Sequence, residues 1–130
     1  MKVKNIRKYL TEEQITERVK AMGEQISKDY GGETVYLICI LKGSIFFTCE
    51  LAKRITSPVE IDFMSVSSYG DDTKSSGVVK IVKDLDQPLI GKDVLIVEDI
   101  IDSGRTLSYL IDILKGRNPN SIHLCTLLDK

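Results

Sequence analysis

The stretch Val94-Leu-Ile-Val-Glu-Asp-Ile-Ile-Asp-Ser-Gly-Arg-Thr-Leu107 decides the fold of this 130-residue chain. Its first four residues are apolar, as in a parallel strand that is buried on both faces. The carboxylates Glu98 and Asp99 come next, followed by a short polar loop and a predicted helix that opens at Leu107. Open α/β sheets bind ligands beyond the carboxyl ends of their strands, and helix N-termini attract phosphate. This order of elements therefore predicts a site for a phosphorylated sugar.

Outside this stretch, the chain repeats the alternation of strand and helix. A capping box at Thr11-Glu-Glu-Gln14 predicts the start of a helix, and Gly31-Gly32 predicts its end. Apolar patterns predict strands at Val35 to Leu41, Val59 to Val66, Val78 to Val82, Asp93 to Val97 and Ser121 to Leu128, and further helices at Ile45 to Ile55 and Leu107 to Lys115. Such units predict a single α/β domain, residues 1–130, with a mainly parallel, twisted sheet flanked by helices.

The bulk composition excludes several classes of partner. The net charge is −1 and charged residues make up 28% of the chain, so no excess of positive charge favours nucleic acid. No apolar stretch approaches a membrane span. Cys39, Cys49 and Cys125 lie in apolar runs without paired spacing, which predicts small buried side chains in a reducing, cytoplasmic compartment. His123 alternates with apolar neighbours in a predicted strand, so we take it as structural.

The acid pair Glu98 and Asp99 has two interpretations. Adjacent residues on a regular strand point to opposite faces, so both can face one ligand only where the strand ends. There they could accept hydrogen bonds from vicinal hydroxyls or hold Mg²⁺. The alternative is a pair of solvated acids after a strand. The apolar strand before them and the polar loop after them favour the ligand site.

The loop from Asp102 to Thr106 also has two interpretations. Gly104 allows close backbone approach, Ser103 and Thr106 supply hydroxyl donors, and successive N–H groups can form an anion nest. The alternative is a simple helix start capped by Asp102 or Ser103. The loop lacks both the P-loop pattern and the dinucleotide fingerprint. A distinct type of phosphate site is therefore expected.

The run from Val94 to Thr106 resembles the phosphoribosyl pyrophosphate motif of type I phosphoribosyltransferases, most closely that of their hypoxanthine-guanine members. Leu41-Lys42-Gly43 resembles the pyrophosphate-binding loop of that family, in which the peptide before the lysine is often cis. Ser67-Ser68-Tyr69-Gly70 resembles the start of the catalytic lid. The resemblance extends from the first predicted helix to Lys130. It implies the type I phosphoribosyltransferase fold, with a mobile lid loop over residues 67–77.

The activity implied by this resemblance is purine salvage. Such a glycosyltransferase moves 5-phosphoribosyl from phosphoribosyl pyrophosphate to N9 of hypoxanthine or guanine, giving IMP or GMP and pyrophosphate, with Mg²⁺ as cofactor. The resemblance implies that Lys42 and Gly43 bind the pyrophosphate, and that Glu98 and Asp99 hold the ribose hydroxyls and the metal. It implies that the 5′-phosphate is bound by Ser103, Gly104, Arg105 and Thr106. It also implies that Asp102 is the catalytic acid or base at purine N7, and that Ser68 and Tyr69 close over the site with the lid.

Some alternatives remain open at this point. Lys42 could be a surface lysine before a helix, and Ser68 and Tyr69 could be ordinary loop residues. The chain could prefer xanthine or another purine, or it could be a non-catalytic regulator that senses nucleotides. Family members typically self-associate, so a dimer or tetramer is expected. Family members also continue beyond the strand at Ser121 to Leu128 with the residues that read the purine. We therefore expect a C-terminally incomplete core with little turnover as an isolated 130-residue chain.

Overall fold

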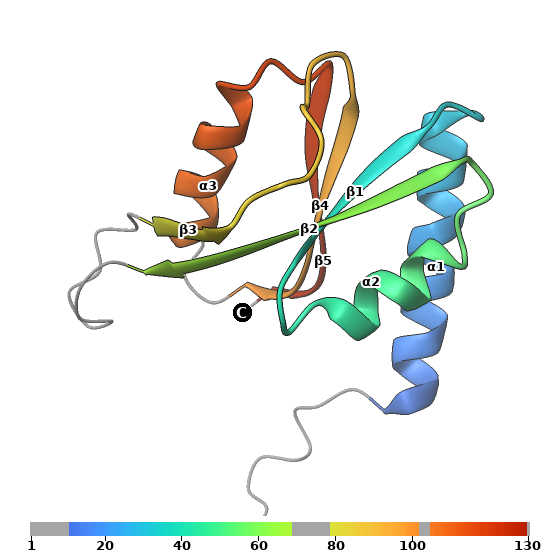
Figure 1. Ribbon diagram of the computed structural model, residues 1–130. Coiled ribbons are helices and arrows are strands. Elements are labelled where there is room, and N and C mark those ends of the chain that lie inside the picture. Colours follow the sequence, from blue (N-terminus) through green and yellow to red (C-terminus); the bar gives the residue numbers. More distant parts are fainter. Residues whose placement is uncertain (1–10, 69–78, 102–104, 130) are drawn as a thin grey trace, which may run out of the picture.

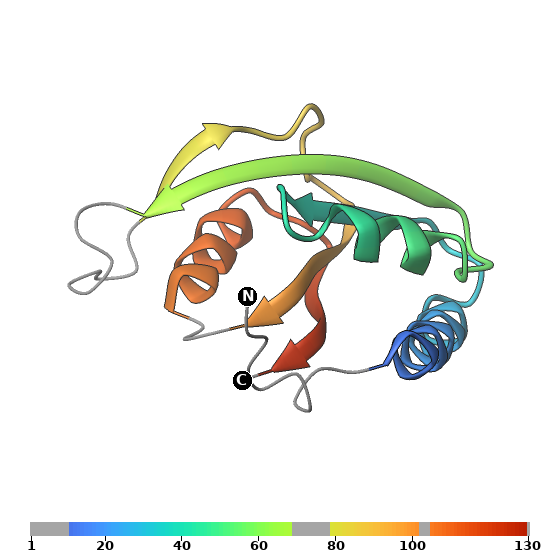
Figure 2. The ribbon, with the colours of Figure 1, turned by 90° about the horizontal axis from the view of Figure 1, so that it is seen from below.

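The computed structural model describes residues 11–68, 79–101 and 105–129, which form one sheet with helices on both faces (Figures 1 and 2). The sheet order is β3-β2-β1-β4-β5. All neighbouring strands pair in parallel except β3, which runs antiparallel to β2. The elements are α1 (Glu12–Tyr30), β1 (Val35–Ile40), α2 (Ile45–Ala52), β2 (Val59–Ser68), β3 (Val79–Lys83), β4 (Asp93–Ile101), α3 (Arg105–Lys115) and β5 (Ser121–Asp129). The predicted α/β class with a mainly parallel sheet is confirmed.

The sheet separates two apolar cores. Strand β1 is central and buried along its whole length, which explains its uninterrupted apolar sequence. One set of its side chains, with Leu95 and Val97 of β4, packs against α1 and α2. The other set, with Val94 and Ile96, packs against α3 through Leu110 and Leu114. Figure 1 shows α3 on one side of the sheet and α1 with α2 on the other.

Helix α1 begins and ends where the sequence predicts. The Thr11 side chain accepts a hydrogen bond from the backbone N–H of Gln14, and the Gln14 side chain accepts one from the backbone N–H of Thr11. Gly31 ends the helix in the left-handed conformation, with φ of 53°. Both ends are set by residues close in sequence, which is why the pattern predicts them.

Two strands run at least two residues further than predicted, and β3 and β5 each end one residue later. Strand β4 continues through Glu98 and Asp99 to Ile101, because it keeps pairing with β5 as far as Asp129. The prediction that β4 ends before the acid pair is therefore wrong. Strand β2 runs to Ser68, and Ser67 pairs with Lys80 of β3, so the predicted loop does not start at residue 67. The remainder of that predicted loop, residues 69–77, lies outside the described residues.

The helices and cysteines bring smaller corrections. Helix α2 ends at Ala52 rather than at residue 55, and α3 begins at Arg105 rather than at residue 107. Cys39 and Cys125 are buried, but Cys49 is exposed on α2, so the prediction of three buried cysteines is wrong for Cys49. Burial raises the pKa of the Cys125 thiol to about 11. Among the described helices, none is long and apolar enough to cross a bilayer.

A buried carboxylate, Asp62, ties β1 and β2 to the connection that follows β3. It is 3% exposed and accepts a hydrogen bond from the Tyr36 hydroxyl. The backbone N–H groups of Asp86 and Gln87 also donate to Asp62 Oδ2, at 2.9 Å and 3.3 Å. Burial opposes the charge of this carboxylate, yet the hydrogen bonds together outweigh burial and lower the pKa of Asp62. The network therefore holds a charged group inside the fold.

Candidate active site at the carboxyl edge of the sheet

The turn after β1 and the acid pair of β4 lie at the same edge of the sheet. Strands β1 and β4 are parallel neighbours, with Cys39 opposite Val97. Residues 41–44 form a turn directly after β1, and the Leu41–Lys42 peptide bond in it is cis. Glu98 and Asp99 follow Val97 on the adjacent strand. The parallel pairing thus places the two predicted segments side by side, although about 55 residues separate them in sequence.

Ser44 joins the turn to the acids. Its hydroxyl donates a hydrogen bond to Glu98 Oε1 at 2.8 Å and accepts one from the backbone N–H of Asp99 at 3.3 Å. A Cβ atom built on Gly43 would lie 3.6 Å from both carboxylate oxygens of Asp99. Both carboxylates therefore reach the 41–44 turn, although the strand does not end before them as the sequence reasoning required.

The acid pair carries concentrated negative charge. Burial raises the pKa of Glu98, and the neighbouring Asp99 carboxylate raises it further, whereas the hydrogen bond from Ser44 opposes the rise. A nearby cation would relieve this repulsion. Within residues 11–68, 79–101 and 105–129, no group of three or more His, Cys, Asp or Glu side chains converges on one point. Two carboxylates fit Mg²⁺, which usually takes one or two protein carboxylates and completes its shell with water and substrate phosphate.

The other predicted site residues are placed only in part. Lys42 is exposed in the turn, and Thr106 is half-buried in the first turn of α3. Arg105 opens α3, and Ser68 ends β2. Asp102, Ser103, Gly104 and Tyr69 lie outside the described residues. The described part of the site therefore consists of the 41–44 turn, the acid pair and the start of α3.

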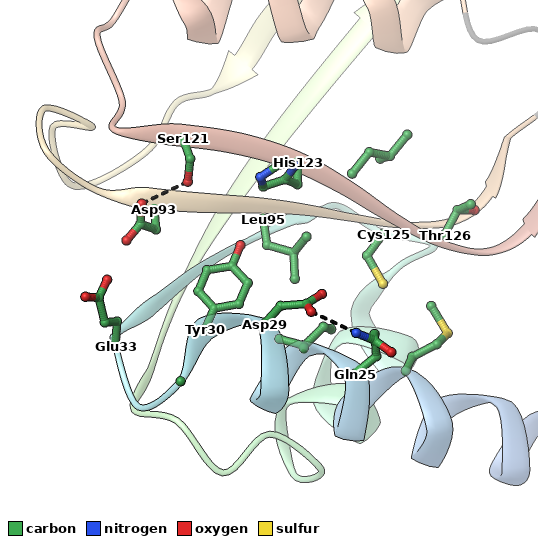
Figure 3. A pocket seen from close by; sticks show the side chains of 14 residues that line it. Gln25, Asp29, Tyr30, Glu33, Asp93, Leu95, Ser121, His123, Cys125 and Thr126 are labelled. Carbon is green, nitrogen blue, oxygen red and sulfur yellow. Dashed lines mark hydrogen bonds between the residues drawn. The ribbon is translucent and has the colours of Figure 1, made fainter.

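Two cavities in the described part of the chain lie at different distances from the acid pair. A recess of about 680 Å³ between α1 and α2 reaches Gly43 and Asp99. A larger cavity of about 950 Å³ lies between α1 and the amino-end halves of β4 and β5, and includes Asp93, Ser121 and His123 (Figure 3). Asp93 and Ser121 are the first residues of their strands. The larger cavity therefore lies mostly beside the amino ends of these strands, although it extends to Thr126, which pairs with Glu98.

Ser44 is the residue that the sequence reasoning missed. As a serine before a predicted helix, it has the expected form of an N-cap, and its position directly after Lys42-Gly43 was the one available sign of another role. In the structure its side chain makes no capping hydrogen bond and turns to Glu98 instead. Only the pairing of β1 with β4 reveals this contact.

Known proteins share both the sequence and the shape of this chain. The model of the phosphoribosyl transferase domain family matches residues 6–130. Hypoxanthine-guanine phosphoribosyltransferase of Streptococcus thermophilus is 50% identical over 128 residues, which are 98% of this chain and 71% of that protein. The chain belongs to the hypoxanthine-guanine phosphoribosyltransferase family. The Mycobacterium tuberculosis member is 52% identical over 127 residues, with 93% of this chain and 63% of that protein covered.

Solved structures of the family agree with this assignment. A crystal structure of hypoxanthine-guanine phosphoribosyltransferase from Bacillus anthracis matches with a TM-score of 0.89 and 47% identity, covering 94% of this chain and 72% of that one. The predicted family, enzyme class and type I phosphoribosyltransferase fold are confirmed. Phosphoribosyltransferases of this family are pentosyltransferases of purine salvage. The family assignment therefore favours an enzyme over the alternative of a non-catalytic regulator that senses nucleotides.

Proposed function

We propose that this chain binds phosphoribosyl pyrophosphate at the carboxyl edge of its sheet and transfers 5-phosphoribosyl to N9 of hypoxanthine or guanine, with Mg²⁺ as cofactor. The observation that carries the proposal is the convergence of the 41–44 turn with the carboxylates of Glu98 and Asp99. Relatives named hypoxanthine-guanine phosphoribosyltransferase support the choice of bases.

The chemistry makes two demands on the protein. Breaking the bond between the anomeric carbon and the pyrophosphate oxygen leaves positive charge on the sugar and negative charge on the leaving group. The 41–44 turn would meet that leaving group with backbone N–H groups and with the exposed Lys42. Glu98 and Asp99 would accept hydrogen bonds from the ribose 2′ and 3′ hydroxyls. Mg²⁺, when bound beside these acids, would supply positive charge to the pyrophosphate.

The segment between β4 and α3 completes the proposed site. Ser103 and Gly104 of this segment, with Arg105 and Thr106 at the start of α3, would clasp the 5′-phosphate, which suits the positive end of the α3 dipole. Asp102 would exchange a proton with N7 of the purine as general base or acid. Ser68 and Tyr69 would begin a lid that excludes water from the reacting sugar. These roles rest on the sequence motif and on the position of β4 and α3 at its two ends.

Product formation with different bases tests the proposed reaction. Little turnover is expected of the isolated 130 residues, and the turnover that occurs should be with hypoxanthine and guanine, releasing pyrophosphate and forming IMP and GMP. Turnover with adenine and xanthine should be at least tenfold lower, because relatives carry the hypoxanthine-guanine name. Faster turnover with xanthine or adenine would overturn the proposed base preference. Binding of phosphoribosyl pyrophosphate without turnover of any base would restrict the proposal to the sugar donor.

A further inference from the structure

Ser44 is a fully buried serine whose hydroxyl serves neither its own helix nor solvent. It is 0% exposed, and it precedes α2 at the N-cap position without a side-chain capping bond. Serine at that position usually accepts a hydrogen bond from an N–H of the first helical turn. Here the backbone carbonyl of Ser44 accepts from the Thr48 N–H at 2.8 Å, while its hydroxyl is directed to β4. The hydroxyl is therefore available for another purpose.

That hydroxyl bonds both members of the acid pair. It donates to the Glu98 carboxylate at 2.8 Å and accepts from the Asp99 N–H at 3.3 Å. The backbone of Ser44 belongs to the 41–44 turn, one residue after Gly43. A hydrogen bond to a charged group is stronger and more directional than one between neutral groups. One side chain thus fixes the position of the acids relative to the turn.

We propose that Ser44 is a positioning residue, which holds the Glu98 carboxylate in register with the 41–44 turn so that ribose and pyrophosphate are bound as one unit. The inference rests on the proposed function, since it assigns Glu98 to the sugar. It adds a residue that the sequence motif does not include. Without the hydroxyl, the half-buried Glu98 carboxylate would lose a hydrogen-bond donor and could shift away from the 41–44 turn.

The test is a double-mutant cycle read out as the affinity for phosphoribosyl pyrophosphate in Mg²⁺ buffer, measured by calorimetry. Ser44→Ala should weaken binding about tenfold, the effect of one hydrogen bond to a charged group. Glu98→Ala should also weaken it. In the Glu98→Ala background, Ser44→Ala should change affinity less than twofold, because Ser44 acts through Glu98. An equal tenfold effect in both backgrounds would overturn the proposal.

A matched control separates positioning from general stability. Ser57 is also buried, and its hydroxyl accepts a hydrogen bond from the Gly32 N–H at 3.2 Å, before the amino end of β2. Ser57→Ala should also lower stability in urea, yet keep wild-type affinity. If Ser57→Ala weakens binding as strongly, a local role for Ser44 is refuted.

A second pair of variants separates the loss of the hydroxyl from changes in packing at this buried position. Ser44→Thr and Ser44→Val introduce side chains of nearly equal volume, and only the first keeps the hydroxyl. The threonine variant should bind about tenfold more tightly than the valine variant, and equal affinities would refute the inference. If Glu98→Ala weakens binding but no Ser44 variant does, the inference alone fails. If Glu98→Ala also leaves affinity unchanged, the proposed function fails with it.

Discussion

Replacing Glu98 by glutamine and Asp99 by asparagine together should weaken Mg²⁺-dependent binding of phosphoribosyl pyrophosphate about a hundredfold or more. The amides keep the shape of the acids but lose the charge that attracts the metal and the strong acceptors that hold the ribose hydroxyls. Each charged hydrogen bond or metal contact is worth about 1.5–3 kcal/mol, and about 1.4 kcal/mol corresponds to a factor of ten. Calorimetric titration with and without Mg²⁺ measures the loss.

The control for this double variant carries the same change in charge at other acids. Glu60→Gln with Asp86→Asn also removes two negative charges, from exposed side chains on β2 and in the connection after β3. This control should bind within twofold of the wild-type chain. If both double variants lose affinity equally, the effect comes from net charge. If the Glu98/Asp99 variant keeps full affinity, the acid pair does not bind the ligand.

Asp62→Ala should lower the free energy of unfolding by about 3 kcal/mol or more. The substitution leaves the Tyr36 hydroxyl and the N–H groups of Phe63, Asp86 and Gln87 without the acceptor that Asp62 supplies. An unpaired buried polar group costs about 1–3 kcal/mol, and four donors are affected to different degrees. Urea unfolding followed by circular dichroism measures the loss. Asp86→Ala removes an exposed acid paired with Lys83 and should cost less than 1 kcal/mol.

The contribution of Asp62 should also depend on pH in a defined direction. Its pKa is lowered in the folded chain from the usual value of 3.8, so the folded state favours the ionised carboxylate. The stability that results is present above pH 3.8 and is lost as the pH falls through the folded-state pKa. The difference in unfolding free energy between wild type and Asp62→Ala should therefore shrink below about pH 4. A constant difference from pH 7 to pH 3 would contradict this account.

Elements specified by nearby residues were predicted well from the sequence. The ends of α1 depend on Thr11, Gln14 and Gly31, which act within a few residues of one another. Strand β1 is apolar throughout because helices cover both faces of the sheet. The peptide bond before Lys42 is cis, as the likeness of Leu41-Lys42-Gly43 to the family's pyrophosphate-binding loop implies. The family that matches is the one that the run from Val94 to Thr106 resembles.

Features that depend on distant partners were missed. The end of β4 is set by its pairing with β5, so the polar residues Glu98 and Asp99 did not mark it correctly. Ser44 has the sequence of a simple N-cap, and its contact with Glu98 exists only because β1 and β4 are neighbours. Cys49 occurs in an apolar run but lies on the exposed face of α2. Local sequence cannot report any of these three facts.

The most direct measurement of the central claim is the location of bound phosphoribosyl pyrophosphate on the wild-type chain. Amide chemical shifts, recorded while the ligand is titrated in Mg²⁺ buffer, report which residues it contacts. The account predicts the largest shifts at Gly43, Ser44 and Asp99, with small ones at Gln25 and Leu124 in the cavity of Figure 3. Large shifts confined to that cavity, with none at the 41–44 turn, would contradict it.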